Sequence, residues 1–502
     1  MATSETTARE WSLRPLAQEA AARLREFLSE SRFGPSGVLE RLKADRIPTK
    51  QGELLPLLLY RTQDPDALNL LIRVFILNVP IEKVNASAAI PADVLENLLA
   101  CGLLTGNGAQ LESPVRLSPF ENLWIVTDTY NRLSRGTGAD DVLTINPTTL
   151  FILNLAIRTP AKTLLDFGAG CGVVGLEAAA NWAEQVTGTD ITARACSFAR
   201  FNASLNGNDA LEILQGDSFA PVAGRKFDRI LANPPFYVTP SSHRVFAENP
   251  MDLDGFCREI VRRSAEHLQE GGFSQLLCEW AEIEGEPWQE RIAEWVSGTG
   301  CDAYCVAGGR YEPAAYTNTR LPVVIPPTDP ETNQANFQHW IDYYARHKVK
   351  AIHAGFLTLR RRSGENWLQI ERADSEPSVQ CGDAILAYFQ TRDRNLDDEA
   401  LLDMHVRLSE GVQLEQRLEF SAGDWKQAPA RILQTKGLRL QDNLAADVAG
   451  FVMHLDGEQR LGDLVAALVE QAAPTPQEAV RKECLSMVRR LISRGFLQLP
   501  PP

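Results

Sequence analysis

The 502-residue sequence lacks the features that mark secreted, membrane-spanning and metal-stabilised proteins. Its nine cysteines include no CxxC pair and its seven histidines show no ligand spacing, so we expect reduced thiols and no metal site. No apolar run is long enough to span a bilayer, and the N-terminus lacks the basic-then-apolar order of a signal peptide. These absences predict a cytoplasmic protein without a membrane partner.

Basic residues are also in the minority, and the formal net charge is −15. This charge disfavours nonspecific binding of long nucleic acid, because counterion release at a basic surface supplies much of that affinity. A local RNA site remains compatible with it. The length predicts two to four domains.

The pattern of apolar residues changes twice along the chain. These changes predict an N-terminal domain over residues 1–115, a central domain over 116–375 and a C-terminal domain over 376–502. The first domain has helical periodicity, and the last is expected to be a smaller α+β domain. The segments "LLACGLL" (98–104) and "LISRGFL" (491–497) share a plan of helix, glycine and short strand. Both are typical of the end of a winged-helix-like unit.

The central domain alternates apolar strand segments with helical ones, which predicts an α/β fold with a doubly wound, mainly parallel sheet. Seven strands are expected, at "KTLLDF", "EQVTGTD", "LEILQGD", "FDRILAN", "FSQLLC", "AYCVA" and "FLTLRR". The stretch "IPPTDPETNQ" (325–334) is predicted to be a loop before the last strand.

A glycine loop, "DFGAGCG" (166–172), follows the first predicted strand and precedes a helix. Its glycines let the backbone approach a ligand closely, beside the free amides of a helix N-terminus. Gly170, Gly172 and Gly175 also spell GxGxxG, with Asp190 twenty residues on, which is compatible with a nicotinamide enzyme. Asp166 at the strand end favours instead a cofactor that carries an ammonium group.

The fourth predicted strand ends in Asn233-Pro234-Pro235-Phe236. With the glycine loop, this motif resembles the class I S-adenosylmethionine-dependent methyltransferases of the NPPF/Y N-methyltransferase type, over roughly residues 117–362. The resemblance implies a Rossmann-like seven-stranded sheet and S-adenosylmethionine as cofactor. The full chain also resembles a group of multidomain bacterial methyltransferases whose substrate the resemblance leaves open.

The resemblance also implies which residues bind the cofactor and which act in catalysis. The methionine part would be bound by Asp166, Gly168, Ala169, Gly170 and Gly172. The ribose would be bound by Asp190 and Ile191, and the adenine by Asp217 with Ser218 or Phe219. The catalytic residues would be Asn233, Pro234, Pro235 and Phe236, with Asn233 also beside the cofactor. Thr148 and Thr149 in "TINPTTL" (144–150) would contact the cofactor or cap a helix.

In such enzymes the nucleophile is a planar NH2 group, whose delocalised lone pair makes it a poor nucleophile. The Asn233 side-chain oxygen and the Pro234 carbonyl can each accept one of its hydrogens, which draws the nitrogen towards tetrahedral geometry. The prolines stiffen the loop, and Phe236 supplies a flat wall.

The motif is shared by enzymes that methylate a carboxamide and enzymes that methylate a nucleobase, so it does not decide which of the two is the methyl acceptor. The segment "ENPMDLDGF" (248–256) resembles glutamine N5-methyltransferases that modify release factors, whereas Phe236 and "FARFNASLNG" (198–207) are frequent in rRNA and tRNA base enzymes. The acidic charge and the N-terminal helical domain favour a protein partner, such as a translation factor, over structured RNA. We therefore expect a glutamine acceptor, with a nucleobase as the alternative. A regulator that binds S-adenosylmethionine without turnover is a remote alternative.

Overall fold

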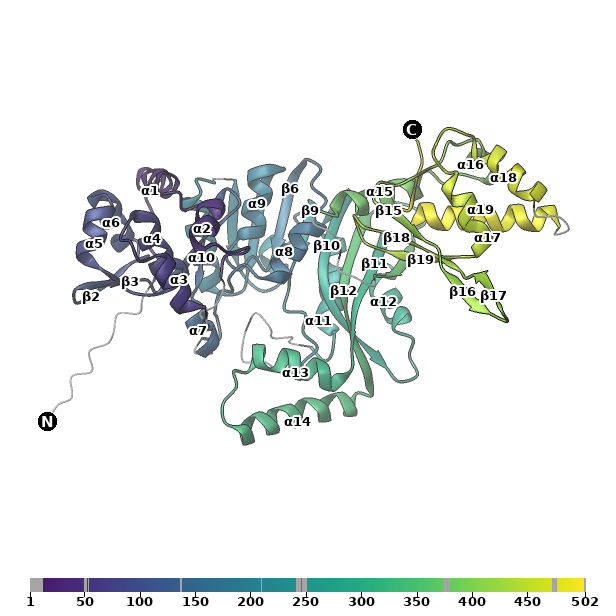
Figure 1. The fold of residues 1–502 in the computed structure, drawn as a ribbon. Helices are drawn as coiled ribbons and strands as arrows, with labels where there is room; N and C mark the ends of the chain where they lie inside the picture. The colour runs from purple at the N-terminus through teal and green to yellow at the C-terminus, as the bar shows by residue number, and fades with distance from the viewer. Residues whose placement is uncertain are drawn as a thin grey trace. The chain divides into compact units, whose positions relative to one another are not determined.

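The structure is a computed structural model that describes residues 12–48, 52, 54–135, 138–208, 210–240, 245, 251–373, 377, 380–471 and 476–500. Its elements are labelled in Figure 1. The chain divides into two compact units. The first comprises residues 1–152, 159–305 and 309–369, and the second comprises residues 153–158, 306–308 and 370–502.

The largest sheet has eight strands in the order β13-β11-β12-β10-β9-β6-β7-β8. Their bounds are β6 Ala161–Phe167, β7 Ala183–Asp190, β8 Leu211–Gln215, β9 Phe227–Ala232, β10 Leu268–Ile283, β11 Cys301–Tyr311, β12 Val349–Arg361 and β13 Leu368–Arg372. Strands β10, β9, β6, β7 and β8 pair in parallel, whereas β12 runs antiparallel to β10. The predicted α/β fold with a mostly parallel sheet is confirmed.

The sheet has one strand more than the seven that the sequence predicts. The seven apolar segments form β6 to β12, and the additional strand β13 lies beside β11. Its five residues are half-buried or exposed without alternation. The sequence therefore carries no period-two signal for this strand.

Helices pack against the parallel strands (Figure 1). Helices α9 (Val173–Asn181) and α10 (Ala193–Leu205) lie against β7 and β8, and α11 (Gly255–Glu266) and α12 (Trp288–Val296) lie against β10. Since parallel strands require crossover connections, the carboxyl ends of β6 to β9 gather at one edge of the sheet.

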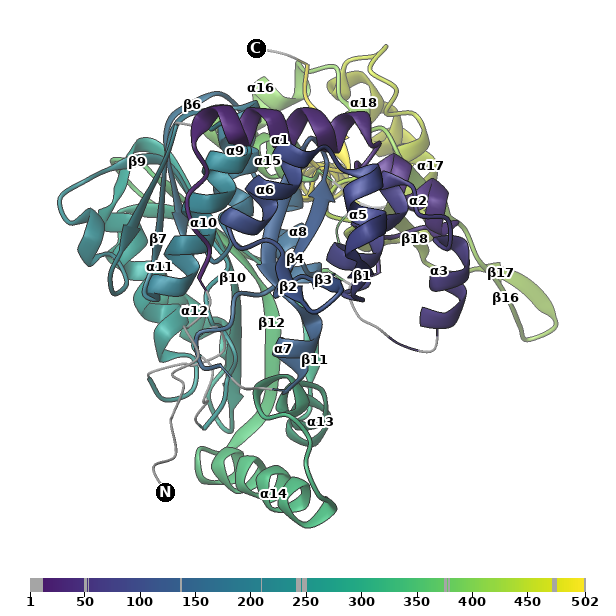
Figure 2. The same cartoon turned by 90° about the vertical axis from the view of Figure 1, so that its left-hand side faces the viewer.

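Short helices and a small sheet precede the large sheet in the first unit. They are α1 Gln18–Glu30, α2 Pro35–Leu42, α3 Leu55–Arg61, α4 Ala67–Leu71, a π-helical turn Ile72–Ile76, α5 Lys83–Ala89, α6 Ala92–Ala100, and strands β1 Ile81–Glu82, β2 Thr105–Asn107 and β3 Gln110–Glu112. Helix α1 packs on α6 and α10 (Figure 2). Arg25 Nη1 donates to the Leu205 carbonyl of α10 at 2.8 Å, which ties the helical part to the sheet.

A hairpin and two helices lead into the large sheet. Strands β4 (Val115–Phe120) and β5 (Leu123–Asp128) pair antiparallel, and α7 (Tyr130–Arg135) and α8 (Pro147–Leu155) follow. Trp124 on β5 donates its Nε1–H to the Phe33 carbonyl at 2.7 Å. This hydrogen bond fixes the hairpin to the N-terminal helices.

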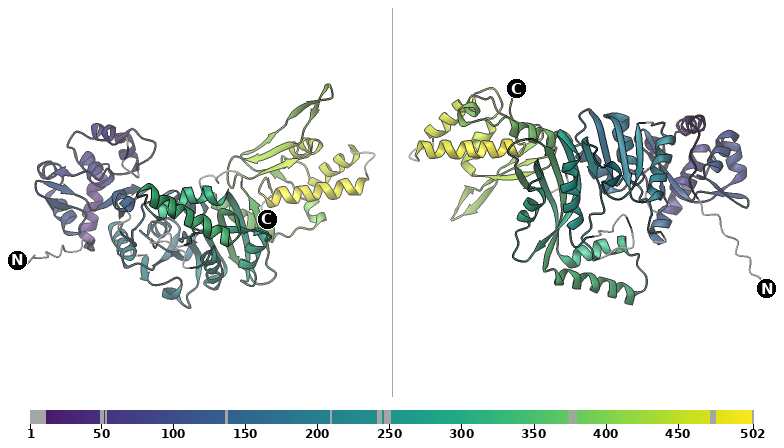
Figure 3. Two further views of the ribbon diagram at one scale, coloured as in Figure 1. Left: turned by 90° about the horizontal axis from the view of Figure 1, so that it is seen from below. Right: turned by 180° about the vertical axis from the view of Figure 1, so that it is seen from behind.

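The predicted loop over residues 325–334 is wrong from residue 330 onward. Two helices connect β11 to β12, α13 (Pro313–Val324) and α14 (Pro330–Arg346), and they lie side by side (Figure 3). Helix α14 begins where it does because Asp329 Oδ1 accepts from the Thr332 amide at 3.0 Å and Pro330 suits the first helical position.

The second unit combines small sheets with helices. Its elements are α15 Gly382–Asp393, α16 Asp398–Leu402, α17 Ala446–Met453, α18 Leu461–Gln471, α19 Gln477–Ser493, and strands β14 Arg407–Leu408, β15 Val412–Glu415, β16 Leu418–Ser421, β17 Asp424–Gln427, β18 Ala430–Gln434, β19 Gln441–Leu444 and β20 Leu497–Gln498. The strands pair as β15-β18-β19, β16-β17 and β14-β20. Helix α19, yellow in Figure 1, is followed by Gly495 with a φ of +75° and by β20. The segment thus has the plan of helix, glycine and strand.

The described helices include none long and apolar enough to cross a membrane. Among the described residues, no group of three or more His, Cys, Asp or Glu side chains could hold a metal ion. All nine cysteines are buried free thiols.

Candidate active site

A cavity of about 470 Å³ opens where β6, β7, β8 and β9 end. Residues that follow all four strands line it, together with the segment before α8. In an open parallel sheet this edge is where ligands bind, and the volume is in the range of cofactor sites.

The glycine loop between β6 and α9 exposes its backbone to this cavity. Gly168 and Gly170 line it and adopt φ values of +71° and +55°, which favour glycine. A Cβ atom added to either would meet no atom within 4 Å, so the loop is open on that side. Ala169 lines the cavity too, whereas Gly172 lies at the start of α9 with Ala199 packed against it.

Asp166 brings a buried carboxyl group to the end of β6. It lines the cavity, is 4% exposed, and its Oδ2 accepts from the Gly175 amide at 2.9 Å. Burial raises the pKa of Asp166 to about 7, the Gly175 hydrogen bond opposes the shift, and the charge of Asp190 adds to it. A cationic ligand group beside this carboxyl would favour its ionised form.

Asp190 at the end of β7 connects the glycine loop to the next helix. Its Oδ2 accepts from the Gly170 amide at 3.0 Å, and its Oδ1 accepts from the Thr192 amide at 2.9 Å. A carboxylate oxygen has further lone-pair capacity, so Asp190 can also accept from ligand hydroxyls. Ile191 follows it and lines the cavity with a half-exposed side chain.

The residues predicted to bind the adenine differ in whether they line the cavity. Asp217 is exposed and lines the cavity, and so does Ser218, whose hydroxyl is buried without a hydrogen-bond partner in the described part of the chain. Phe219 is not part of the cavity wall. Its ring is fully buried, 4.7 Å from that of Phe167 and stacked at 4.9 Å on His267, so it belongs to the core.

The Asn-Pro-Pro-Phe motif starts directly after β9, and all four of its residues line the cavity. Asn233 Nδ2 donates to Thr148 Oγ1 at 3.2 Å, and this hydroxyl donates to Asn146 Oδ1 at 2.7 Å. This hydrogen bond fixes the side-chain amide of Asn233, whose oxygen is its acceptor atom and can accept from a ligand. Phe236 is 9% exposed.

Asn146 is a site residue that the sequence analysis missed. Its Oδ1 accepts from the Thr149 amide at 3.0 Å, which caps α8, and it also orients Thr148. The Asn-Pro pair at a helix start is the signal that could have identified it. The segment 140–143 also lines the cavity, and no motif in the sequence indicates it.

The segment 248–256, which resembles glutamine enzymes, is described from residue 251 onward. Asp254 is 1% exposed and accepts from Arg291 Nη2 at 2.6 Å and from the Ala281 amide at 2.9 Å. Phe256 lines the cavity. Residues 248–250 lie outside the described residues.

Three family models match the chain. The methyltransferase small domain matches residues 144–279, which contain the glycine loop and the Asn-Pro-Pro-Phe motif. Two domains of unknown function, DUF7059 and DUF7782, match residues 30–114 and 386–499.

Curated relatives match between a quarter and a third of the chain. A "putative protein N5-glutamine methyltransferase" of Methanocaldococcus jannaschii is 31% identical over 134 residues, 26% of this chain and 67% of the relative. A ribosomal RNA small subunit methyltransferase C of Pseudomonas fluorescens is 32% identical over 28% of this chain and 36% of its own. A release factor glutamine methyltransferase of Deinococcus radiodurans is 33% identical over 30% of this chain and 62% of its own. The matches to the last two thus span less than two thirds of each relative.

The fold and the cavity define an α/β domain with a ligand cavity at the carboxyl ends of its parallel strands and a glycine loop at the end of the first of them. The chain belongs to the class I S-adenosylmethionine-dependent methyltransferases. The cofactor of this family is S-adenosylmethionine and not a nicotinamide. The open glycines and the buried Asp166 carboxyl fit the amino-acid end of this cofactor.

Cofactor affinity is expected to depend on pH through Asp166. With a pKa of about 7, its carboxyl is mostly protonated at pH 6 and mostly ionised at pH 8, and an ammonium group binds the ionised form. We expect S-adenosylhomocysteine to bind about tenfold more tightly at pH 8 than at pH 6, measured by isothermal titration calorimetry. The Asp166→Asn variant should bind weakly and without this dependence. The same pH profile in both proteins would contradict the assignment.

The stability of the free protein should follow the opposite trend. Because folding raises the pKa of Asp166 from 3.8 to about 7, the native state binds more protons between these values. The stabilising contribution is complete below pH 3.8 and is lost as the pH rises through 7. Denaturant titrations at pH 5 and pH 8 should show a smaller decline for Asp166→Asn than for the wild type.

Thr148→Val is expected to lower the turnover number about tenfold, because it frees the Asn233 amide to rotate away from the acceptor. Thr149→Val is the matched control, since Thr149 Oγ1 also donates to Asn146, at 3.2 Å. Steady-state rates of labelled methyl transfer distinguish the two variants. An equal loss in both would show that helix capping, and not the orientation of Asn233, matters.

Proposed function

We propose that this methyltransferase acts on a planar NH2 group and that its acceptor is a protein glutamine side chain. The observation that carries the proposal is the hydrogen bond from Asn233 Nδ2 to Thr148 Oγ1. It fixes the amide plane of Asn233 beside the cavity, so that the Asn233 oxygen and the neighbouring Pro234 carbonyl can accept the two hydrogens of one NH2 group.

S-adenosylmethionine supplies an electrophilic methyl group on a sulfonium sulfur. The residues of the chain prepare the acceptor nitrogen. Two acceptors on its hydrogens reduce the delocalisation of its lone pair, and the stiff Pro234-Pro235 pair fixes the loop. The bound cofactor would supply the methyl group for the new C–N bond and would leave as S-adenosylhomocysteine with the C–S electron pair, and the acceptor nitrogen would lose one proton to solvent. Orientation of this kind is worth several kcal/mol.

Two observations support a protein acceptor. Two of the relatives are named for glutamine methylation, and the net charge of −15 disfavours extended phosphate contacts. On this proposal, residues 1–115 form the docking domain for the protein substrate, 116–375 the catalytic domain and 376–502 a further substrate-contacting domain. The separate family matches over 30–114 and 386–499 support this division.

A nucleobase NH2 group is the second candidate. The 32% identity to a ribosomal RNA methyltransferase favours it, as does phenylalanine at position 236. A flat aromatic wall suits a base as well as an amide, because both are planar.

Methyl-labelled S-adenosylmethionine and a lysate of the source cells distinguish the two acceptors. Label that protease removes and ribonuclease spares supports glutamine methylation. Label that ribonuclease removes supports the nucleobase. No label in either fraction, with a protein that binds S-adenosylhomocysteine, would contradict both and favour a regulator without turnover.

A further inference from the structure

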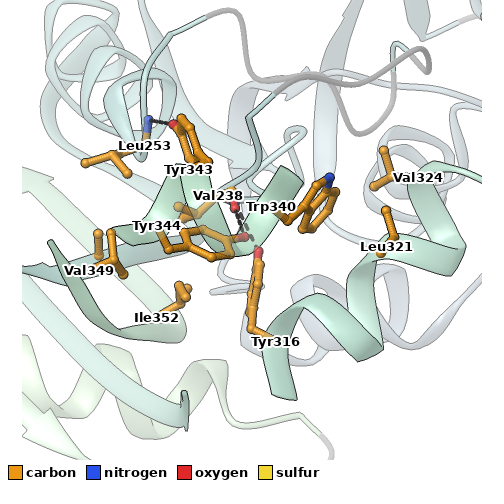
Figure 4. Packing of buried hydrophobic residues seen from close by; sticks show 11 residues of the cluster. Val238, Leu253, Tyr316, Leu321, Val324, Trp340, Tyr343, Tyr344, Val349 and Ile352 are labelled. Carbon is orange, nitrogen blue, oxygen red and sulfur yellow. Dashed lines mark hydrogen bonds between the residues drawn. The ribbon is translucent and has the colours of Figure 1, made fainter. Parts of the chain in front are cut away.

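Helices α13 and α14 contribute side chains to a buried hydrophobic cluster. Val238 and Leu253, which follow the catalytic motif in the sequence, belong to the same cluster. The cluster is drawn in Figure 4 and consists of Val238, Leu253, Ala281, Tyr316, Leu321, Val324, Trp340, Tyr343, Tyr344, Val349 and Ile352. Three of these side chains are tyrosines of the two helices. Their hydroxyl groups point at the main chain of the segment that follows the catalytic motif (Figure 4).

The three hydroxyl groups make hydrogen bonds at two points of this main chain. At Val238, Tyr316 Oη accepts from the amide at 3.0 Å and Tyr344 Oη donates to the carbonyl at 2.7 Å. At Leu253, Tyr343 Oη accepts from the amide at 2.8 Å. Helices that lie outside the central sheet thus fix both points.

Each point lies next to an aromatic wall of the cavity. Val238 follows Phe236 and Tyr237, which line the cavity, and Leu253 precedes Phe256, which also lines it. We call residues 236–238 and 253–256 the acceptor flanks. A displacement of either flank would move a wall of the cavity beside Asn233.

The second flank requires an external constraint because its backbone is strained. Leu253 has a φ of +54°, a left-handed conformation that a bulky residue rarely adopts. Tyr343 holds its amide, and the next residue, Asp254, is anchored by Arg291 and the Ala281 amide. The surrounding contacts therefore maintain a conformation that the chain would not favour alone.

The first flank is tied to the sheet by a buried ionic network. Tyr316 donates to Glu279 on β10, and Arg320 Nη2 donates to the same carboxyl at 2.5 Å. The Arg320 guanidinium also lies 4.7 Å from the centre of the Tyr237 ring. A 1% exposed carboxylate needs such partners, so the network fixes Tyr316 and Tyr237 together.

We propose that helices α13 and α14 are the positioning element for the methyl acceptor, with Tyr343 and Tyr344 as positioning residues that set the acceptor flanks beside Asn233. This inference rests on the proposed function, since it assigns the aromatic walls to the acceptor. The residues proposed to bind the cofactor line the cavity on other elements, at the ends of β6, β7 and β8. The helices should therefore affect acceptor use without affecting cofactor affinity.

Hydrogen exchange of the full-length protein tests the contacts directly. In Tyr343→Phe the Leu253 amide loses its acceptor, so peptides covering residues 251–256 should exchange faster than in the wild type. Tyr344→Phe should leave these peptides unchanged, because Tyr344 contacts a carbonyl at the other flank. Unchanged exchange in Tyr343→Phe would overturn the proposal.

Kinetics of the Tyr343→Phe/Tyr344→Phe double variant test the consequence for the acceptor. Label from S-adenosylmethionine is followed into a lysate of the source cells at increasing lysate concentration. We expect the apparent kcat/KM for the lysate acceptor to fall about tenfold, with S-adenosylhomocysteine affinity unchanged. Tyr388→Phe is the matched control, a buried tyrosine on α15 whose hydroxyl accepts from Arg392 at 3.2 Å.

The outcomes separate the two proposals. A wild type that labels the lysate and a double variant that matches it would overturn the positioning role. A wild type that transfers no label contradicts the proposed function, and the exchange of the Leu253 amide then decides the inference. An equal loss in Tyr388→Phe would show a general effect of tyrosine substitution and would also overturn it.

Discussion

Asn233→Ala is expected to lower the rate of methyl transfer by about a thousandfold and to leave S-adenosylhomocysteine affinity unchanged. In the proposed mechanism the side-chain oxygen of Asn233 accepts one hydrogen of the substrate NH2 group during transfer, and alanine would leave that hydrogen unpaired. Within the described part of the chain, the residues proposed to bind the cofactor, the glycine loop with Asp166 and Asp190, make no hydrogen bond to this side chain, which bonds to Thr148. Single-turnover transfer of labelled methyl and calorimetric binding give the two quantities.

Asn181→Ala is the control for this variant. Asn181 ends α9, donates to the Glu177 carbonyl at 2.9 Å and lies outside the cavity wall. Its substitution should preserve transfer. A fully active Asn233→Ala would contradict the assigned mechanism, and a parallel loss of cofactor affinity would show that Asn233 serves the cofactor instead.

Asp190→Ala is expected to weaken S-adenosylhomocysteine binding about a hundredfold. In its predicted role Asp190 accepts from the ribose hydroxyls, and the variant also loses the carboxylate that accepts from the Gly170 and Thr192 amides. Each hydrogen bond to a charged group contributes about 1.5–3 kcal/mol, and the loss of two accounts for the estimate. Calorimetric titration of the full-length protein measures the change.

Asp228→Ala is the matched control, because Asp228 also accepts main-chain hydrogen bonds from a neighbouring strand. Its Oδ2 accepts from the Lys162 and Thr163 amides at 3.0 and 2.9 Å, at the start of β6. That end of the strand is opposite to the cavity, so we expect lower stability and normal cofactor affinity. Equal affinity losses in both variants would indicate a general loss of folding and contradict the assigned role of Asp190.

The sequence predicted seven strands of the large sheet because buried strands appear as short apolar segments. All seven such segments are strands in the structure. Strand β13 lacks that signal, and α14 follows a proline-rich stretch that is also typical of loops. Both elements depend on contacts with β11 and β12, which a local pattern does not record.

The sequence places the candidate site residues at the ends of the predicted strands. The glycine loop, Asp166, Asp190, Asp217 and Asn233 all line the cavity. Phe219 was placed at the adenine because it neighbours Asp217, but a buried aromatic is also what a core requires. Contacts that orient the site join residues 78 to 106 positions apart, such as Tyr316 with Val238, Thr148 with Asn233 and Tyr344 with Val238. A local sequence motif does not reveal contacts between residues so far apart in the chain.

Acid hydrolysis of the labelled product tests the central claim most directly, which is methyl transfer to a planar nitrogen. A glutamine methylated on its side-chain nitrogen releases labelled methylamine on hydrolysis. A methylated nucleobase instead retains the label on its exocyclic nitrogen after digestion to nucleosides. The account predicts labelled methylamine from the protease-sensitive fraction of the wild type and none from Asn233→Ala. Label recovered on carbon, oxygen or sulfur would contradict it.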